Sequence, residues 1–338
     1  MTIHSVSVVV PVYKSAQTLL ELHRRLVEVL QPLTSSLEII FVDDGGGDDS
    51  WSVITQISQS DHRVLGFQHS RNYGQHNALL TGIRAASHEV IVTLDDDLQN
   101  PPEEIPKMLA VLDLGYDVVY GTPELEQHGQ MRDMASRITK IALQIAMGAD
   151  TGRNFSAFRV FRTFLRDAFS DYRNPFVSID VLLTWGTTSF SSVRVRHEPR
   201  KVGVSNYTFG KLVRHALNMM TGFSVLPLQF ASLIGFFFTI VGFGLLSYVL
   251  VNYLLHGSTV AGFAFIASMV ALFSGAQMLA IGIIGEYLAR MHMRSMGRPA
   301  GVVRQSVGIG LDSTTAFQRS VGVKRESEAR TGGRVISL

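Results

Sequence analysis

Three consecutive aspartates, Asp95 to Asp97, follow an apolar run and are closed off within a few residues by the helix-breaking pair Pro101-Pro102. Carboxylates at the end of a strand can converge on a hard divalent cation, and Mg2+ or Mn2+ prefers such oxygen ligands together with the phosphates of a substrate. A solvated acidic turn would show the same residues. The cluster alone is therefore compatible with a metal site and with a surface turn.

Two further strand ends carry polar or aromatic side chains. Asp43-Asp44 close the apolar run that begins at Leu37, and Tyr13 closes the run that begins at Val6. In an open α/β sheet, ligands bind at the carboxyl ends of the strands. Three such ends at one edge predict a site for the base, ribose and diphosphate of a nucleotide. The pattern alone also fits a nucleotide-binding module without catalysis.

Short β-branched runs alternate with helical stretches up to about residue 122. The expected strands are Val6–Tyr13, Leu37–Asp44, Val64–Ser70, Val90–Asp97 and Tyr116–Gly121. Apolar residues from Leu19 to Leu30 follow helical spacing. This alternation predicts an α/β fold with a mostly parallel, Rossmann-like sheet and right-handed crossovers. Between residues 122 and 201 the pattern is less clear, with a helix expected at Arg132–Met147 and strand structure near Ser191–Arg196.

The charges are distributed unevenly along the chain. The 30 basic and 28 acidic residues nearly cancel, so no global field favours a nucleic acid as partner. Between Arg214 and Glu286 there is no Asp, Glu, Lys or Arg, which no soluble domain of ordinary composition would show. The absence of cysteine excludes disulfides and thiolate metal sites. The uncharged region predicts a membrane segment.

The uncharged region divides at His256–Thr259 into two apolar stretches, 228–255 and 260–285. Each exceeds the roughly 20 residues that span a bilayer, so they predict a transmembrane hairpin. Basic residues flank the hairpin on both sides, which by the positive-inside rule makes both flanks cytoplasmic. The N-terminus lacks the pattern of a signal peptide. We therefore expect an inner or plasma membrane protein with two spans, whose sheet domain and both termini are cytoplasmic.

These patterns divide the chain into four segments. Residues 1–208 are expected to form the cytoplasmic sheet domain and residues 227–288 the hairpin. Residues 209–226 place apolar side chains on one helical face, which predicts an amphipathic helix in the membrane interface, with a surface helix packed on the domain as the alternative. Residues 289–338 are rich in Gly, Ser, Arg and Glu, and we expect a cytoplasmic, mostly disordered tail.

Four motifs in order, "VVVPVYKSAQTL", "EIIFVDDGGGDDS", "SRNYGQHNALLTGI" and "TLDDDLQNPPEEIP", resemble family-2 glycosyltransferases of the dolichol-phosphate mannose synthase type. The bacterial enzymes that load undecaprenyl phosphate with glucose or aminoarabinose look nearest. The resemblance resumes at "RKVGVSNYTF" and at "GEYLARMHMRSMGRP" after the second span. It implies a GT-A fold and a metal-dependent, inverting transfer of a sugar from a nucleotide sugar, with UDP expected, to polyprenyl phosphate at the cytoplasmic membrane face. The product would serve glycan or lipid modification of the cell envelope.

The resemblance also implies roles for individual residues, and Asp44 would accept the imide proton of the nucleobase. The nucleotide-sugar site would comprise Pro11, Val12, Tyr13, Val42, Asp44, Asp95, Arg200 and Asn206. The metal, Mg2+ or Mn2+, would be held by Asp97 and Gln99. The lipid phosphate would be received by Arg132 and Ser136. The catalytic group would comprise Asp95, Asp97 and Arg200.

Some positions depart from the pattern of this family. Ser15 replaces the Glu that is common in the "PVYNE" form, and Asn206 replaces the Lys of "SKY", which removes a cation near the donor. Asp96 stands where the relatives usually have Ala, so we expect it to take no part in the site. None of these changes touches the predicted metal ligands.

Two other functions share parts of this pattern. A processive polysaccharide synthase would show a Q-x-x-R-W motif and more spans, and neither tryptophan of this chain lies in such a motif. A non-catalytic nucleotide-sugar sensor or scaffold in the membrane would be favoured by loss of the metal ligands. The expected partners are the nucleotide sugar, polyprenyl phosphate, membrane lipid and further copies of the chain in a homo-oligomer such as a tetramer. The identity of the sugar stays open, as does uridine against guanosine.

Overall fold

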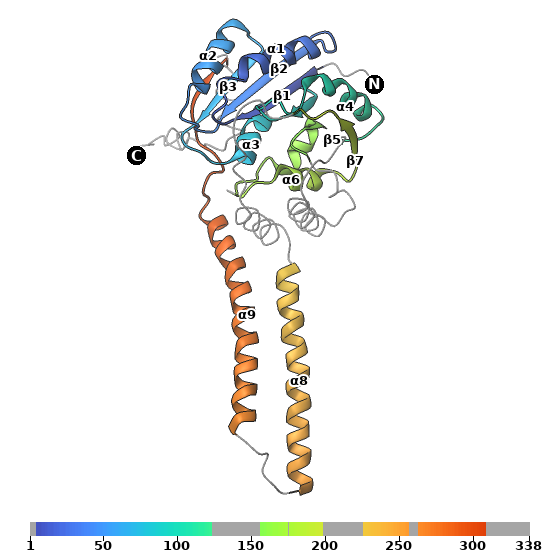
Figure 1. Cartoon of the computed structure of the whole chain (residues 1–338), viewed down its shortest axis with the longest axis vertical. Coiled ribbons are helices and arrows are strands. Elements are labelled where there is room, and N and C mark those ends of the chain that lie inside the picture. Colours follow the sequence, from blue (N-terminus) through green and yellow to red (C-terminus); the bar gives the residue numbers. More distant parts are fainter. Residues whose placement is uncertain (1–4, 124–155, 175, 199–225, 257–262, 309–338) are drawn as a thin grey trace, which may run out of the picture. The chain divides into compact units, whose positions relative to one another are not determined.

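The computed structural model describes residues 5–123, 156–174, 176–198, 226–256 and 263–308 (Figure 1). The chain divides into two compact units. The first contains the sheet and the segment that follows Pro299, and the second contains two long helices. The helices predicted at Arg132–Met147 and at 209–226 lie outside the described residues.

The first unit is built on one mixed sheet of eight strands in the order β7-β5-β6-β4-β1-β2-β3-β8. Its centre is parallel: β4 (Val90–Thr93), β1 (Ser5–Val12), β2 (Ser36–Asp43) and β3 (Val64–His69) run in one direction. The five strands predicted for this region are present, with β5 at Val118–Pro123. β4 ends at Thr93, its last residue paired with β1, so the aspartates lie in the turn beyond it.

Antiparallel strands join this parallel centre on both sides. β6 (Arg159–Arg162) lies between β4 and β5 and runs antiparallel to both. β7 (Phe190–Val195) pairs with β5 in parallel and confirms the strand structure expected near Ser191. Sequence reasoning missed β6, because a short strand flanked by arginines gives neither an alternating pattern nor a long apolar run.

Helices cover both faces of the sheet (Figure 1). One core cluster lies against α1 (Leu19–Leu30), α2 (Ser50–Ser60) and α4 (Ile105–Leu112), and the other against α3 (Gln75–Ala85) and α6 (Ile179–Gly186). Since the central strands are buried on both faces, they are apolar almost throughout. α3 crosses β1 closely: a Cβ on Gly82 would lie 2.4 Å from Cγ1 of Val9.

The segment after the second long helix returns to the sheet as β8 (Val303–Val307), which pairs antiparallel with β3. The backbone N–H of Ser70 donates to the carbonyl of Val302 at 2.9 Å, and Nε1 of Trp51 donates to Oε1 of Gln305 at 3.0 Å. The expectation of a mostly disordered tail is therefore wrong up to residue 308. The strand covers the edge that β3 would otherwise expose. Composition did not predict it because its central side chains are polar and exposed.

The second unit holds α8 (Leu226–His256) and α9 (Phe263–Ser295), which fall on the two predicted apolar stretches. Both are long and apolar enough to cross a membrane, with mean hydropathy 2.2 over Pro227–Asn252 and 1.4 over Leu272–Ser295. α9 continues beyond the predicted end of its span into a charged turn, where Arg290 pairs with Glu286. The orientation of the hairpin in the membrane stays a prediction.

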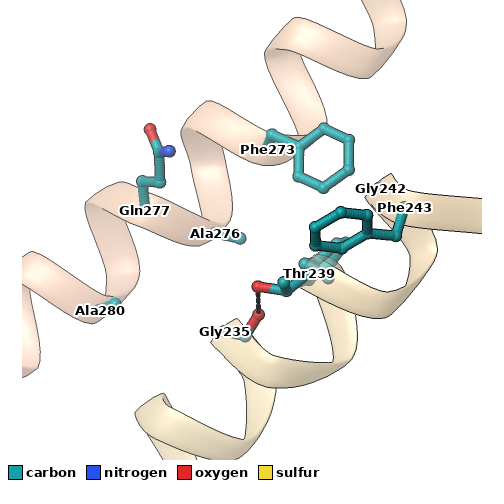
Figure 2. A pocket seen from close by; sticks show the side chains of 9 residues that line it. Gly235, Thr239, Gly242, Phe243, Phe273, Ala276, Gln277 and Ala280 are labelled. Carbon is teal, nitrogen blue, oxygen red and sulfur yellow. Dashed lines mark hydrogen bonds between the residues drawn. The ribbon is translucent and has the colours of Figure 1, made fainter. Parts of the chain in front are cut away.

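α8 and α9 leave a pocket of about 480 Å3 between them. Figure 2 shows side chains of the two helices that line it. Its walls are small or aromatic side chains together with Thr239 and Gln277, and the complete lining is Gly235, Phe238, Thr239, Gly242, Phe243, Phe273, Ala276, Gln277 and Ala280. The rings of Phe238 and Phe273 meet edge to face at 5.7 Å. Small residues at such positions let two helices approach closely in lipid.

Candidate functional site at the carboxyl edge of the sheet

The acidic turn after β4 alternates between open and buried side chains. Asp95, Asp97 and Gln99 are partly exposed, whereas the residues between them, Asp96 and Leu98, are buried. Leu98 has a φ of 61°, in the left-handed region that non-glycine residues rarely adopt. Its conformation lets the backbone N–H of Gln99 donate to Oδ1 of Asp97 at 3.1 Å. The three side chains predicted to contact the donor and the metal are therefore partly exposed to solvent.

Neighbouring elements hold this turn in place. Nε2 of Gln75, the first residue of α3, donates to Oδ1 of Asp95 at 2.6 Å. The backbone N–H of Glu198, beyond the end of β7, donates to the carbonyl of Gln99 at 2.9 Å. The predicted metal turn is thus fixed from two sides. Arg200 itself lies outside the described residues, two positions after Glu198 in the sequence.

The loop after β1 carries Tyr13, which is predicted to belong to the nucleotide-sugar site. Pro11 and Val12 are buried in the strand, and Tyr13 is 48% exposed at its end. Lys14 has a left-handed φ of 57°, and its ammonium lies 5.4 Å from the centre of the Tyr13 ring. The glycine loop after β2 packs closely against the backbone of Lys14, because a Cβ on Gly46 would lie 2.8 Å from the backbone nitrogen of Lys14. The loop is strained and closely packed, as is common at functional sites.

Asp44, predicted to read the nucleobase, is buried and 3% exposed. Its Oδ1 accepts from the backbone N–H of Tyr73 at 2.9 Å and lies 2.8 Å from Nδ1 of His69, and its Oδ2 accepts from the N–H of Gly74 at 2.7 Å. Nε2 of His69 lies 3.0 Å from the hydroxyl of Thr81. Asp44 therefore holds the "SRNYG" turn. Its contact with a base stays a prediction, and sequence reasoning missed the network because His69 lies 25 positions away.

Asp96 has a place that the sequence did not predict. Its Oδ2 accepts from the backbone N–H of Tyr13 at 2.9 Å, and the side chain is 9% exposed. Burial raises the pKa of the Asp96 carboxyl to about 6, against the opposing effect of hydrogen bonds from Ser15 and Tyr13. The expectation that this residue takes no part is wrong in structural terms, because it joins two of the strand ends.

The donor set fits a divalent cation shared with a substrate. Among the described residues, no group of three or more His, Asp or Glu side chains could hold a metal by itself. Asp97 and Gln99 offer a carboxylate and an amide oxygen, both partly exposed. Mg2+ is usually bound through one or two carboxylates together with water and substrate phosphates. The turn suits a metal that arrives with a diphosphate.

The structure brings together eight of the predicted site residues at the ends of three adjacent strands, β4, β1 and β2. They are Pro11, Val12, Tyr13, Val42, Asp44, Asp95, Asp97 and Gln99. The other predicted residues lie outside the described part of the chain, and their roles stay predictions: Arg132, Ser136, Arg200 and Asn206. The site as described is therefore the half that would meet a nucleotide and a metal.

Comparison with known proteins adds the family. The profile of the family described as "Glycosyl transferase family 2" matches residues 7–173. The undecaprenyl-phosphate 4-deoxy-4-formamido-L-arabinose transferase of Enterobacter sp. (strain 638) is 33% identical over 316 residues, which cover 93% of this chain and 97% of that protein. The enzyme of the same name from Proteus mirabilis is 32% identical over 310 residues, with coverage of 91% and 95%.

Solved structures resemble part of the chain more distantly. The glucosyl-3-phosphoglycerate synthase of M. tuberculosis matches with a TM-score of 0.47 and 17% identity, over 64% of this chain and 78% of that one. A second structure of that synthase, described as a complex with Mn2+, UDP-glucose and phosphoglyceric acid, matches with a TM-score of 0.45 and 16% identity, over 65% and 79% of the two chains.

Proposed function

We propose that this chain, which belongs to glycosyl transferase family 2, transfers a sugar from a nucleoside diphosphate sugar to the phosphate of a polyprenol. One observation carries this proposal: the chain aligns over 97% of the length of an undecaprenyl-phosphate sugar transferase, so the alignment includes the apolar helices as well as the sheet domain. A lipid acceptor explains why one chain combines a nucleotide site with two such helices.

The donor would lie along the ends of β1, β2 and β4. The exposed ring of Tyr13 offers a face for the base, and Asp95 lies at the end of β4 on the side of α3, where the sugar would be held. Asp97 and Gln99 would hold a divalent cation, which would neutralise charge on the departing diphosphate. Arg200 would contact the same diphosphate. We infer UDP as the nucleotide, in line with the family resemblance.

The acceptor would need positioning more than activation. A phosphate monoester has a second pKa near 6, so at neutral pH it is already an anionic nucleophile. No general base is then required, and proximity and alignment supply the remaining part of the acceleration. Arg132 and Ser136 would receive the lipid phosphate, and in-line attack would invert the configuration at the anomeric carbon. We place this reaction at the cytoplasmic face of the inner or plasma membrane, in a homo-oligomer.

The test is a transfer assay with the full chain purified in detergent. Undecaprenyl phosphate, Mg2+ or Mn2+, and a panel of radiolabelled UDP- and GDP-sugars are supplied, and label is followed into the lipid extract. We expect a labelled lipid with at least one donor, and none when the phosphate of the acceptor is absent. Tight nucleotide-sugar binding without transfer across the panel would favour a sensor or scaffold, and would contradict the proposed reaction.

A further inference from the structure

The middle carboxylate of the acidic turn links that turn to the loop after β1. Oδ2 of Asp96 accepts from the backbone N–H of Tyr13 at 2.9 Å. The hydroxyl of Thr18 lies 2.6 Å from the carbonyl oxygen of Asp96. Both contacts cross from the turn after β4 to the segment after β1, so the two strand ends are joined by side chains as well as by the sheet.

The same loop is held from its other side by the start of α2. The backbone N–H of Ser15 donates to the hydroxyl of Ser50 at 3.0 Å, and that of Ala16 to Oδ2 of Asp48 at 3.4 Å. Between these anchors Lys14 keeps its left-handed φ of 57°. A conformation of this kind persists only when the surrounding contacts over-determine it. Asp96 supplies the contacts on the side of the metal turn.

We propose that Asp96 is a positioning residue for nucleotide binding: it fixes the backbone of Tyr13 relative to Asp97 and Gln99. The ring of Tyr13 and the turn that carries Asp97 and Gln99 would then bind one nucleoside diphosphate as a preformed unit. Preorganisation of this kind raises affinity by removing the cost of ordering the loops on binding. This inference rests on the proposed function, because it assumes that the edge binds a nucleoside diphosphate with a metal.

Hydrogen bonding, rather than negative charge, is the property that the position requires. The carboxyl accepts from a backbone N–H, and the described residues place no cationic side chain in an ion pair with it. An amide of the same shape can accept the Tyr13 N–H through its oxygen.

The experiment measures binding of UDP and GDP, each with Mg2+, to the full chain in detergent by isothermal titration calorimetry. We expect Asp96→Ala to weaken the Kd of the preferred nucleotide about tenfold and Asp96→Asn to stay within about threefold of wild type. Asp113→Ala is the matched control, because this aspartate follows α4 at the edge where the strands begin. In the transfer assay the KM for the nucleotide sugar should rise with Asp96→Ala, while the KM for polyprenyl phosphate stays unchanged.

The readouts separate positioning from simple loss of stability. A merely unstable variant would show fewer binding sites with an unchanged Kd, and that result overturns the inference. Equal weakening by Asp96→Ala and Asp96→Asn would overturn the hydrogen-bonding role. If Asp96→Ala does not fold, Thr18→Val decides: it removes the contact with the Asp96 carbonyl, and a Kd less than twofold weaker than wild type would count against the inference. Failure of wild type to bind either nucleotide would instead refute the proposed function.

Discussion

The two acidic strand ends of this protein look alike in sequence and differ in use. After β2, Asp43 and Asp44 are 2% and 3% exposed, and their carboxylates accept hydrogen bonds from the chain itself. After β4, Asp95 and Asp97 are partly exposed, and only Asp96 between them is buried. The acidic end after β2 holds the loops of the site in place, and the acidic end after β4 keeps two carboxylates partly exposed.

Carboxylates at a strand end therefore have to be divided into those that hold the structure together and those that can bind a ligand before a role is assigned. A buried carboxylate that accepts several hydrogen bonds contributes to folding, and its removal leaves donors without partners. A partly exposed one is available to a ligand, and its removal should spare the fold.

The largest effect should come from Asp97→Ala. We expect transfer to fall by about 100-fold or more, since a group that stabilises the charge developing on a leaving group commonly contributes this much. Because Asp97 is partly exposed, the melting temperature of the variant should stay close to that of wild type. Initial rates and thermal melts of the same preparation provide the check. Near-wild-type turnover would show that Asp97 is not required for sugar transfer.

Asp44→Ala should act on stability first. It would leave His69 and the N–H groups of Tyr73 and Gly74 without their shared acceptor, which we expect to cost about 3–5 kcal/mol, as for breaking a buried charged network. Thermal or chemical unfolding in detergent measures the loss.

Asp49→Ala is the matched control for Asp44, because Asp49 lies in the following loop and is exposed. It should change stability by no more than about 0.5 kcal/mol. If Asp44→Ala melts like Asp49→Ala, the supporting role assigned to the β2 end is wrong.

Asp61 is a further buried aspartate that supports the fold, and its contribution should make stability depend on pH. Asp61 is 8% exposed, and burial alone would raise its pKa, but hydrogen bonds from Arg63 and His23 outweigh burial and hold the pKa well below its usual range. A depressed pKa means that its stabilisation is present above the ordinary value near 3.9 and is lost as pH falls through that value and below.

Asp61→Asn should therefore be less stable than wild type at pH 7, by about 1.5–3 kcal/mol. The gap in melting temperature should begin to narrow as the pH is lowered from 5 toward 3.5. A series of melts across this range is the measurement, and a gap that stays constant over the whole range would contradict the assignment.

The smallest effect tests the strain at the loop after β1. Lys14→Gly and Lys14→Ala both remove the long side chain, but only glycine adopts a φ of 57° without steric cost. The glycine variant should be the more stable of the two by about 1 kcal/mol. Paired unfolding curves measure the difference directly, and an alanine variant of equal or greater stability would show that the backbone is not strained there.

The parallel centre of the fold could be predicted from the sequence because its strands are apolar on both faces and its helices have clear periodicity, as in β1 and α1. The open members of the acidic turn could be assigned through motif resemblance. β6 and β8 could not, since both are short and antiparallel, and their partners lie far away in the chain. The roles of Asp96 and His69 depend on contacts 83 and 25 positions apart, which no local pattern records.

Mn2+ electron paramagnetic resonance tests directly whether the turn after β4 binds a metal together with a nucleoside diphosphate. The amplitude of the free Mn2+ signal is followed as the full chain is added in the presence of UDP, for wild type and Asp97→Ala. We predict that wild type depletes the free signal beyond what UDP does alone, and that Asp97→Ala, although folded, does not. Equal depletion by the two proteins, or none by wild type with UDP or GDP, would contradict the account.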